Sequence, residues 1–163
     1  MKISTLILLA VLAGLSTSSC FLGDDEIFLL PKGHRGLVLV ILNQHNGEKI
    51  RYEDTKKRVY EIPENGILKT QFTPNTDSHH PDKYFYVENE QRIEIPYVDD
   101  PRQLRDDTIQ VCCFSFGRAG KAPNVNNILA EYYEFYVGTK ADIDKAMEKS
   151  NKIDPADLVE PSK

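Results

Sequence analysis

The chain has 163 residues, of which 40% are hydrophobic and 28% are charged. This balance excludes both a disordered chain and a body embedded in the membrane. The formal net charge is −5, without a dominant basic tract, and cationic side chains supply most of the affinity for nucleic acids. We therefore expect one globular domain and no nucleic-acid partner.

The first 19 residues have the pattern of an export signal. Lys2 precedes an apolar run from Ile3 to Leu15, and small polar residues occupy positions 16–19. A run of about 13 residues is too short to cross a bilayer as a helix, which needs about 20. We predict that residues 1–19 form a signal peptide that is removed.

Cys20 follows these small residues directly, an arrangement that resembles the lipobox of bacterial lipoproteins. In lipoproteins the thiol is acylated and the cysteine becomes the new N-terminus. Thr17 stands where the pattern prefers Leu, and ordinary signal-peptidase cleavage to a soluble protein is the alternative. We predict that Cys20 is lipidated, with acyl chains such as palmitate holding the protein at a membrane.

Residues 20–26 are expected to form a tether between this anchor and the domain. Its acidic end, Asp24-Asp25-Glu26, resembles the export signal of Bacteroidota-type lipoproteins displayed on the cell surface. Acidic residues also keep a tether solvated, so a periplasm-facing location stays open. The expected location is the cell envelope, with the lipid anchor in the outer membrane.

From Ile27 onward, short apolar and alternating segments recur at the spacing of an all-β domain. The segments that predict strands are 27–30, 37–42, 49–52, 58–62, 67–72, 84–88, 91–98 and 108–116. Residues 37–42 are apolar throughout, which is typical of a central strand. Asn46-Gly47 predicts a hairpin that leads into 49–52, and residues 88–90 predict a second hairpin. Pro96 is expected to end a strand or to lie on an edge.

The last third of the chain is expected to contain a helix. Residues 126–137 allow helix or strand, and their aromatic content favours strand. Thr139 is predicted to cap the following helix, with Asp142 completing a capping box. Residues 151–163 are expected to form a loose tail. The predicted fold class is mainly β: an antiparallel β-sandwich over residues 27–150 with one C-terminal α-helix, and a prealbumin-like arrangement is one candidate.

Cys112 and Cys113 are adjacent in a predicted strand, so their side chains are expected to point to opposite faces of the sheet. We interpret both as buried, unreactive thiols, because free cysteine behaves as a small hydrophobic residue. A disulfide between the two neighbours is the alternative, although it would strain the peptide bond that joins them.

No group of polar residues matches a known catalytic, metal or cofactor site. The loop 77–82 offers His79 and His80 to zinc, but adjacent side chains in an extended loop diverge. The aspartates of the loop 99–107 lack the spacing and the glycine of an EF-hand. Residues 117–121 lack two positions of a phosphate loop. We therefore predict no catalytic residue, no metal and no cofactor.

Three residues of the aromatic run are candidates for a binding surface. Tyr132, Glu134 and Tyr136 alternate along a predicted strand and therefore share one of its faces. One face of the strand must enter the core, and the other can offer Tyr side chains to a ligand or a partner. Packing of this face under a loop or against the C-terminal helix is the alternative.

A resemblance to a known family rests on several segments of the chain. These are 28–33, 37–43, 52–54, 59–70, 84–87 and 135–139. They resemble an uncharacterised family of Bacteroidota-type bacterial lipoproteins that is known only as a domain of unknown function. The resemblance implies a lipoprotein, and it supplies neither an activity nor catalytic residues.

Two functions of different classes remain. We predict a lipid-anchored envelope protein with a binding or structural role and no catalysis, whose partner is the membrane and, beyond it, an unidentified protein or small ligand. The alternative is a secreted or envelope hydrolase whose acidic groups converge only in the fold. A concave site that holds two carboxylates, or a histidine with acids, would favour the hydrolase.

Overall fold

The computed structural model describes residues 23–54, 56–75, 83–120 and 130–159. The strands are β1 (Asp25–Pro31), β2 (Gly36–Ile41), β3 (Tyr52–Glu53), β4 (Lys57–Glu61), β5 (Ile67–Lys69), β6 (Lys83–Glu88), β7 (Gln91–Ile95), β8 (Tyr97–Val98), β9 (Gln110–Ala119) and β10 (Ala130–Gly138). The helices are α1 (Lys140–Ser150) and two short 3-10 turns, η1 (Pro101–Gln103) and η2 (Pro155–Asp157).

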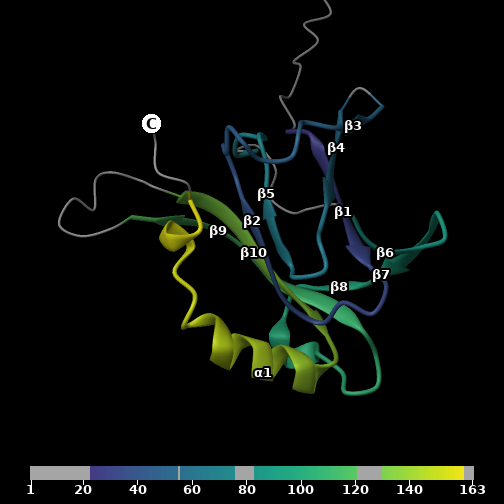
Figure 1. Cartoon of the computed structure of the whole chain (residues 1–163). Helices are drawn as coiled ribbons and strands as arrows, with labels where there is room; N and C mark the ends of the chain where they lie inside the picture. Colours follow the sequence, from purple (N-terminus) through teal and green to yellow (C-terminus); the bar gives the residue numbers. More distant parts are fainter. Residues whose placement is uncertain (1–22, 55, 76–82, 121–129, 160–163) are drawn as a thin grey trace, which may run out of the picture.

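The strands form two five-stranded sheets that enclose the core between them (Figure 1). Sheet A has the order β3-β4-β1-β6-β7, and sheet B has the order β5-β2-β10-β9-β8. In the described residues one α-helix, α1, follows the last strand and packs against β2 and β10. The predicted fold class, a mainly β sandwich with one C-terminal helix, is confirmed.

The sheets are mixed, whereas the sequence predicted antiparallel pairing. β1 runs parallel to β4 and β6, β2 runs parallel to β5, and β8 runs parallel to β9. Parallel pairs arise because β1–β2 and β4–β5 both cross from sheet A to sheet B. At each crossover a proline, Pro31 or Pro63, stops the ladder. Gly33 and Gly66 then turn the chain with φ angles of 81° and 76°.

The hairpin predicted at Asn46-Gly47 is wrong. β2 pairs with β5 and β10 in sheet B, while β3 pairs with β4 in sheet A. After this turn the chain instead runs beside the end of β5, where Glu48 forms an isolated parallel bridge with Thr70. A Cβ atom at Gly47 would lie 2.7 Å from the backbone of Lys69, so only glycine permits this approach.

The second predicted hairpin is confirmed. β6 and β7 are antiparallel neighbours, and Asn89 and Glu90 between them have φ angles of 47° and 66°. Two consecutive positive φ angles are what a tight two-residue hairpin turn requires. β7 ends at Ile95, and beyond Pro96 the chain enters sheet B as β8, so the predicted strand ends at the proline as expected.

The C-terminal elements follow local sequence signals. Residues 130–138 form a strand, β10, in agreement with their aromatic content. The side chain of Thr139 accepts a hydrogen bond from the backbone N–H of Asp142, and the Asp142 carboxylate accepts one from the Thr139 N–H. This is the predicted capping box, and the helix buries Ile143 completely. Beyond the helix, η2 packs against β10 and buries Ala156.

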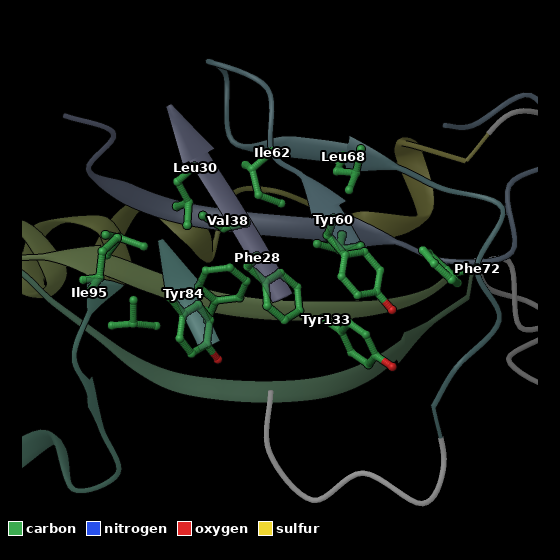
Figure 2. Packing of buried hydrophobic residues seen from close by; sticks show 14 of the residues in the cluster. Phe28, Leu30, Val38, Tyr60, Ile62, Leu68, Phe72, Tyr84, Ile95 and Tyr133 are labelled. Atoms are coloured by element: carbon green, nitrogen blue, oxygen red, sulfur yellow. The ribbon is translucent and has the colours of Figure 1, made fainter. Parts of the chain in front are cut away.

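The core between the sheets is built around Phe28, which is fully buried. Within sheet A its ring stacks on Tyr60 and Tyr84, with centroid distances of 4.7 and 5.3 Å (Figure 2). From sheet B, Phe135 and Phe114 direct their rings edge-on to it at 5.1 and 6.3 Å. One side chain therefore contacts aromatic rings of both sheets.

A carboxyl group, Glu26, is buried at one end of this aromatic core and is 1% exposed. The Tyr60 hydroxyl donates to its Oε1 at 2.8 Å, and Figure 2 shows the Tyr60 and Tyr133 hydroxyls pointing to the same side. Burial raises the pKa of Glu26 from 4.5 to about 7, although the Tyr60 hydrogen bond and the charge of Arg58 oppose the rise. Near neutral pH this carboxyl group therefore holds a proton in part of the molecules.

The acidic residues expected in the tether belong to the fold. Asp25 and Glu26 are the first residues of β1. Asp24 accepts a hydrogen bond from Arg58 Nε at 2.9 Å. Of Asp24, Asp25 and Glu26, only Asp25 is exposed.

Replacing Phe28 with Ala should lower the free energy of unfolding by about 3–5 kcal/mol, because it removes the ring that contacts both sheets. The control is Phe116→Ala, since Phe116 is 43% exposed, and we expect it to cost less than about 1 kcal/mol. Chemical denaturation of each purified variant measures the two losses. Equal losses would show that Phe28 has no special place in the core.

Glu26→Gln should change how stability depends on pH. Because the folded-state pKa of Glu26 lies above its unfolded value, the fold gains stability from the bound proton at low pH and loses it as pH rises from about 4.5 to about 7. Relative to Glu26→Gln, the wild type should therefore lose about 2 to 3 kcal/mol between pH 5 and pH 8. Denaturation at several pH values measures this, with the exposed Glu148→Gln as control. A constant difference across the range would contradict the shift.

Candidate functional site

A hollow of about 630 Å³ lies where the two crossovers meet α1. We call it the crossover hollow. It is lined by Gly33, His34, Arg35, Gly36, Leu37, Glu64, Asn65, Asp142, Lys145, Ala146, Lys149, Ser150 and Ile153. Its walls therefore come from three segments that are distant in the sequence.

Close backbone packing holds the two crossovers together. The backbone N–H of Leu39 donates to the carbonyl of Gly66 at 2.9 Å. A Cβ atom at Gly66 would lie 2.6 Å from the Leu37 carbonyl oxygen and 2.9 Å from the imidazole of His34. Gly66 therefore allows the second crossover to lie directly on the first, and this contact positions His34 at the wall of the hollow.

The crossover hollow carries more positive than negative charge. Three cations, Arg35, Lys145 and Lys149, line it together with two anions, Glu64 and Asp142. This surplus of one positive charge stands on a chain whose formal net charge is −5. A concave, positively charged surface on an acidic protein favours an anionic ligand over a cationic one.

One of the two anions is already paired. Arg35 donates to the Asp142 carboxylate at 2.5 Å, and the same carboxylate closes the cap of α1. The hydrogen bond from Arg35, followed by the one from the Thr139 backbone, lowers the pKa of Asp142. Within the described residues no ion pair engages Lys145 or Lys149, whose side chains lie on the exposed face of α1.

His34 is partly buried in the wall of the hollow. Burial lowers its pKa, although interactions with the backbone of Leu37 and Glu64 oppose the change, so the imidazole is neutral at pH 7. Its Nε2 atom is buried and has no hydrogen-bond partner among the described residues. The Tyr86 hydroxyl donates to the His34 carbonyl at 2.6 Å and fixes the backbone there.

The hollow thus contains a histidine and two carboxylates, which is the composition that the hydrolase alternative requires. In the described part of the chain, no hydrogen bond joins the His34 side chain to the carboxylate of Glu64 or of Asp142, and the interaction of His34 with Glu64 is with its backbone. A general base acts on a proton within hydrogen-bonding reach and is oriented by a further group. The geometry therefore provides a binding surface more directly than it provides a catalytic pair.

The three residues predicted as a binding surface lie on β10, outside the crossover hollow. Tyr136 is 3% exposed and packs with Ile143 beneath α1. Its hydroxyl donates to the Glu134 carboxylate and lies 2.8 Å from Ser150 Oγ, and burial raises its pKa. Tyr132 is partly buried, and its ring covers Gly117 of β9. The helix therefore covers one end of this face, and a binding role for these residues stays a prediction.

The cysteine prediction is wrong in one respect, because the two side chains do not point to opposite faces. Cys112 pairs with Tyr136 and Ser115 pairs with Glu134, so the register shifts between them. This is a β-bulge, in which Cys113 has a φ of 61°. Both cysteines consequently pack against the same apolar cluster beneath α1, and both are free thiols.

The remaining candidate loops carry no assembled site in the residues described. His79 and His80 lie outside the described residues. In the loop 99–107, Asp100 pairs with Arg102, and Asp107 pairs with Arg105. No group of three or more His, Cys, Asp or Glu side chains in the described ranges is placed to hold a metal ion.

Across the described residues, no helix has both the length and the apolar character needed to span a bilayer. The predicted signal peptide, residues 1–19, and the predicted lipidation site, Cys20, lie outside the described residues.

Comparison with known proteins identifies a fold relative and a family. The crystal structure of a candidate lipoprotein from Bacillus anthracis is similar, with a TM-score of 0.52 and 21% identity over 75% of each chain. At that identity the similarity concerns the fold alone, and no curated protein matches the chain. Residues 23–147 match DUF6843, a family of unknown function. The predicted resemblance to a domain of unknown function is confirmed, its Bacteroidota-type assignment stays a prediction, and the chain belongs to the DUF6843 family.

Proposed function

We propose that this protein is a lipid-anchored module of the cell envelope that binds an anionic ligand in the crossover hollow and does not catalyse a reaction. One observation carries the proposal. The first residues that line the hollow come shortly after the last residue of β1, whereas the predicted anchor, Cys20, comes before the first residue of β1. In Figure 1, α1, which lines the hollow, lies at the end of the molecule opposite the start of β1. The domain would therefore hold its binding surface away from the membrane.

The length of chain between Cys20 and β1 limits how far the domain can lie from the membrane. Cys20 precedes Asp25, the first residue of β1, by five positions, so the connection spans at most about 20 Å. β1 has 7 residues and rises by about 3.3 Å per residue, so it adds about 20 Å more. The start of the domain would lie close to the bilayer, and the hollow would face the space beyond.

The charge of the hollow supports an anionic ligand. Lys145 and Lys149 are neighbours on one face of α1, since they are four residues apart, and both line the hollow. His34 adds a buried ring nitrogen without a hydrogen-bond partner among the described residues. Phosphate or carboxylate groups are the ligands that such cations recognise.

We predict that Cys20→Ala releases the protein from the membrane fraction, because acyl chains supply its attachment. The wild type should fractionate with membranes and carry the mass of the lipid, and the variant should be soluble and unmodified. Cys113→Ala, which keeps Cys20, serves as the control and should behave as the wild type. Membrane association of Cys20→Ala without a change of mass would contradict the anchor.

We predict that the double variant Lys145→Ala/Lys149→Ala weakens binding of pyrophosphate or citrate by about tenfold or more at low ionic strength, which corresponds to about 1.4 kcal/mol. Isothermal titration measures the affinity. The matched control is Lys57→Ala/Lys83→Ala, which removes the same charge from sheet A, where these lysines pair with Asp54 and Glu94. Equal losses in both variants, or no binding by the wild type, would contradict a site in the hollow.

The hydrolase alternative is tested on the same protein. Its support is the presence of His34, Glu64 and Asp142 in one hollow. Turnover of ester, phosphoester or glycoside reporter substrates by the wild type, lost in His34→Ala, would overturn the non-catalytic role. If the wild type hydrolyses none of these substrates but binds the anionic probe, the result supports the proposed non-catalytic binding role.

A further inference from the structure

Beneath α1, β9 places two free thiols on the same side of sheet B. Cys112 is fully buried in the apolar cluster that contains Tyr136 and Ile143, and Cys113 packs against the same cluster from a partly exposed position. We propose that Cys112 and Cys113 form a reversible disulfide with each other, which makes this site a redox-responsive dithiol.

The β-bulge is the feature that makes this bond feasible. In a regular strand, neighbouring side chains point to opposite faces, and adjacent cysteines cannot meet. Here Cys113 and Phe114 together oppose Phe135, because the register shifts between Glu134 and Tyr136. The bulge turns Cys113 towards the face that Cys112 occupies, and the alternation resumes with Phe114, which packs in the core between the sheets.

The backbone at Cys113 is strained. Its φ of 61° lies in the left-handed region, which residues with a Cβ atom adopt at a cost. Such conformations persist where the surrounding structure imposes them, and they are frequent at functional sites. Bulges likewise occur where a side chain must be redirected. In this strand the redirected side chain is a thiol beside a second thiol.

The two thiols differ in access. Burial, followed by the interaction with the Cys113 side chain, raises the pKa of Cys112. Reduced Cys112 therefore stays protonated, and the protonated thiol is the unreactive form. Cys113 is partly exposed, so an oxidant reaches Cys113 first.

The chemistry is thiol–disulfide exchange with a disulfide as the oxidant, for example oxidised glutathione or the active-site disulfide of an oxidoreductase. The Cys113 thiolate attacks one sulfur of the oxidant, forms a mixed disulfide and releases one thiol. Cys112 then loses its proton and attacks Cys113 Sγ. The new bond displaces the second thiol, so two protein thiols are oxidised and the oxidant is reduced to two thiols.

The closed ring includes the peptide bond between the two residues, and strained disulfides are reduced more easily than relaxed ones. We therefore expect a bond that forms and opens with the surrounding thiol–disulfide balance. A structural disulfide would instead stay oxidised.

The test uses the full-length Cys20→Ala chain, because the sequence holds three cysteines and Cys112 and Cys113 are then the only thiols. The reduced protein is incubated with oxidised glutathione, quenched with acid and an alkylating reagent, and analysed by intact mass. We expect a monomer lighter by the mass of two hydrogen atoms, without a glutathione adduct, and we expect dithiothreitol to restore both thiols.

Two variants in the same background assign the steps. Cys112→Ala should accumulate a stable glutathione adduct at Cys113, because the resolving thiol is gone. Cys113→Ala should form an adduct at Cys112 about tenfold more slowly, because that thiol is buried. Circular dichroism confirms that each variant is folded, and the measurement on the unsubstituted pair decides the proposal if either variant is not.

Three results would overturn the proposal. They are retention of both thiols after incubation with an excess of oxidised glutathione, accumulation of the glutathione adduct in the presence of Cys112, and disulfides between chains in place of a bond within one chain. The first would show inert thiols, the second would show that Cys112 does not resolve, and the third would show that the two sulfurs do not meet.

Discussion

The fold depends on the contact of Phe28 with aromatic rings from both sheets. This contact requires β1 to be the central strand of sheet A, between β4 and β6. β1 is apolar on both faces, since Phe28 and Leu30 enter the core while Ile27 and Leu29 form a cluster on the outside. A strand with parallel neighbours cannot be joined to them by tight hairpins. The chain therefore crosses to sheet B after β1 and again after β4, and the two crossovers meet.

Local signals predicted the elements of this fold better than their pairing. Thr139 and Asp142 are close in the sequence, and their capping box was predictable because it needs no distant residue. Asn46-Gly47 marks a turn, but whether that turn closes a hairpin depends on which sheet the next strand joins. That choice is made by burial of side chains far away in the sequence, such as Phe28 and Tyr60. The local propensities of the residues therefore do not show which sheet a strand joins.

The candidate sites were hidden for the same reason. His34, Glu64 and Lys145 come together only because two crossovers and α1 converge, and none belongs to a motif. The bulge at Cys113 could not be predicted either. A continuous run of apolar residues has the same pattern whether or not the strand contains an extra, unpaired residue. α1 is common to both sites: Ala146 lines the crossover hollow and also packs against the cluster that holds Cys112 and Cys113.

The position of the acidic triplet has a consequence for its predicted role as a signal for surface display. In the folded domain Glu26 is buried and Asp24 is held by Arg58, so Asp25 is the one acidic side chain of the three that β1 leaves exposed. A receptor that reads Asp24, Asp25 and Glu26 together must meet them before β1 pairs with β4. Recognition of this triplet by a sorting receptor would then compete with folding of the domain. The rate at which β1 pairs within sheet A would set how long the three acidic residues stay accessible to the receptor.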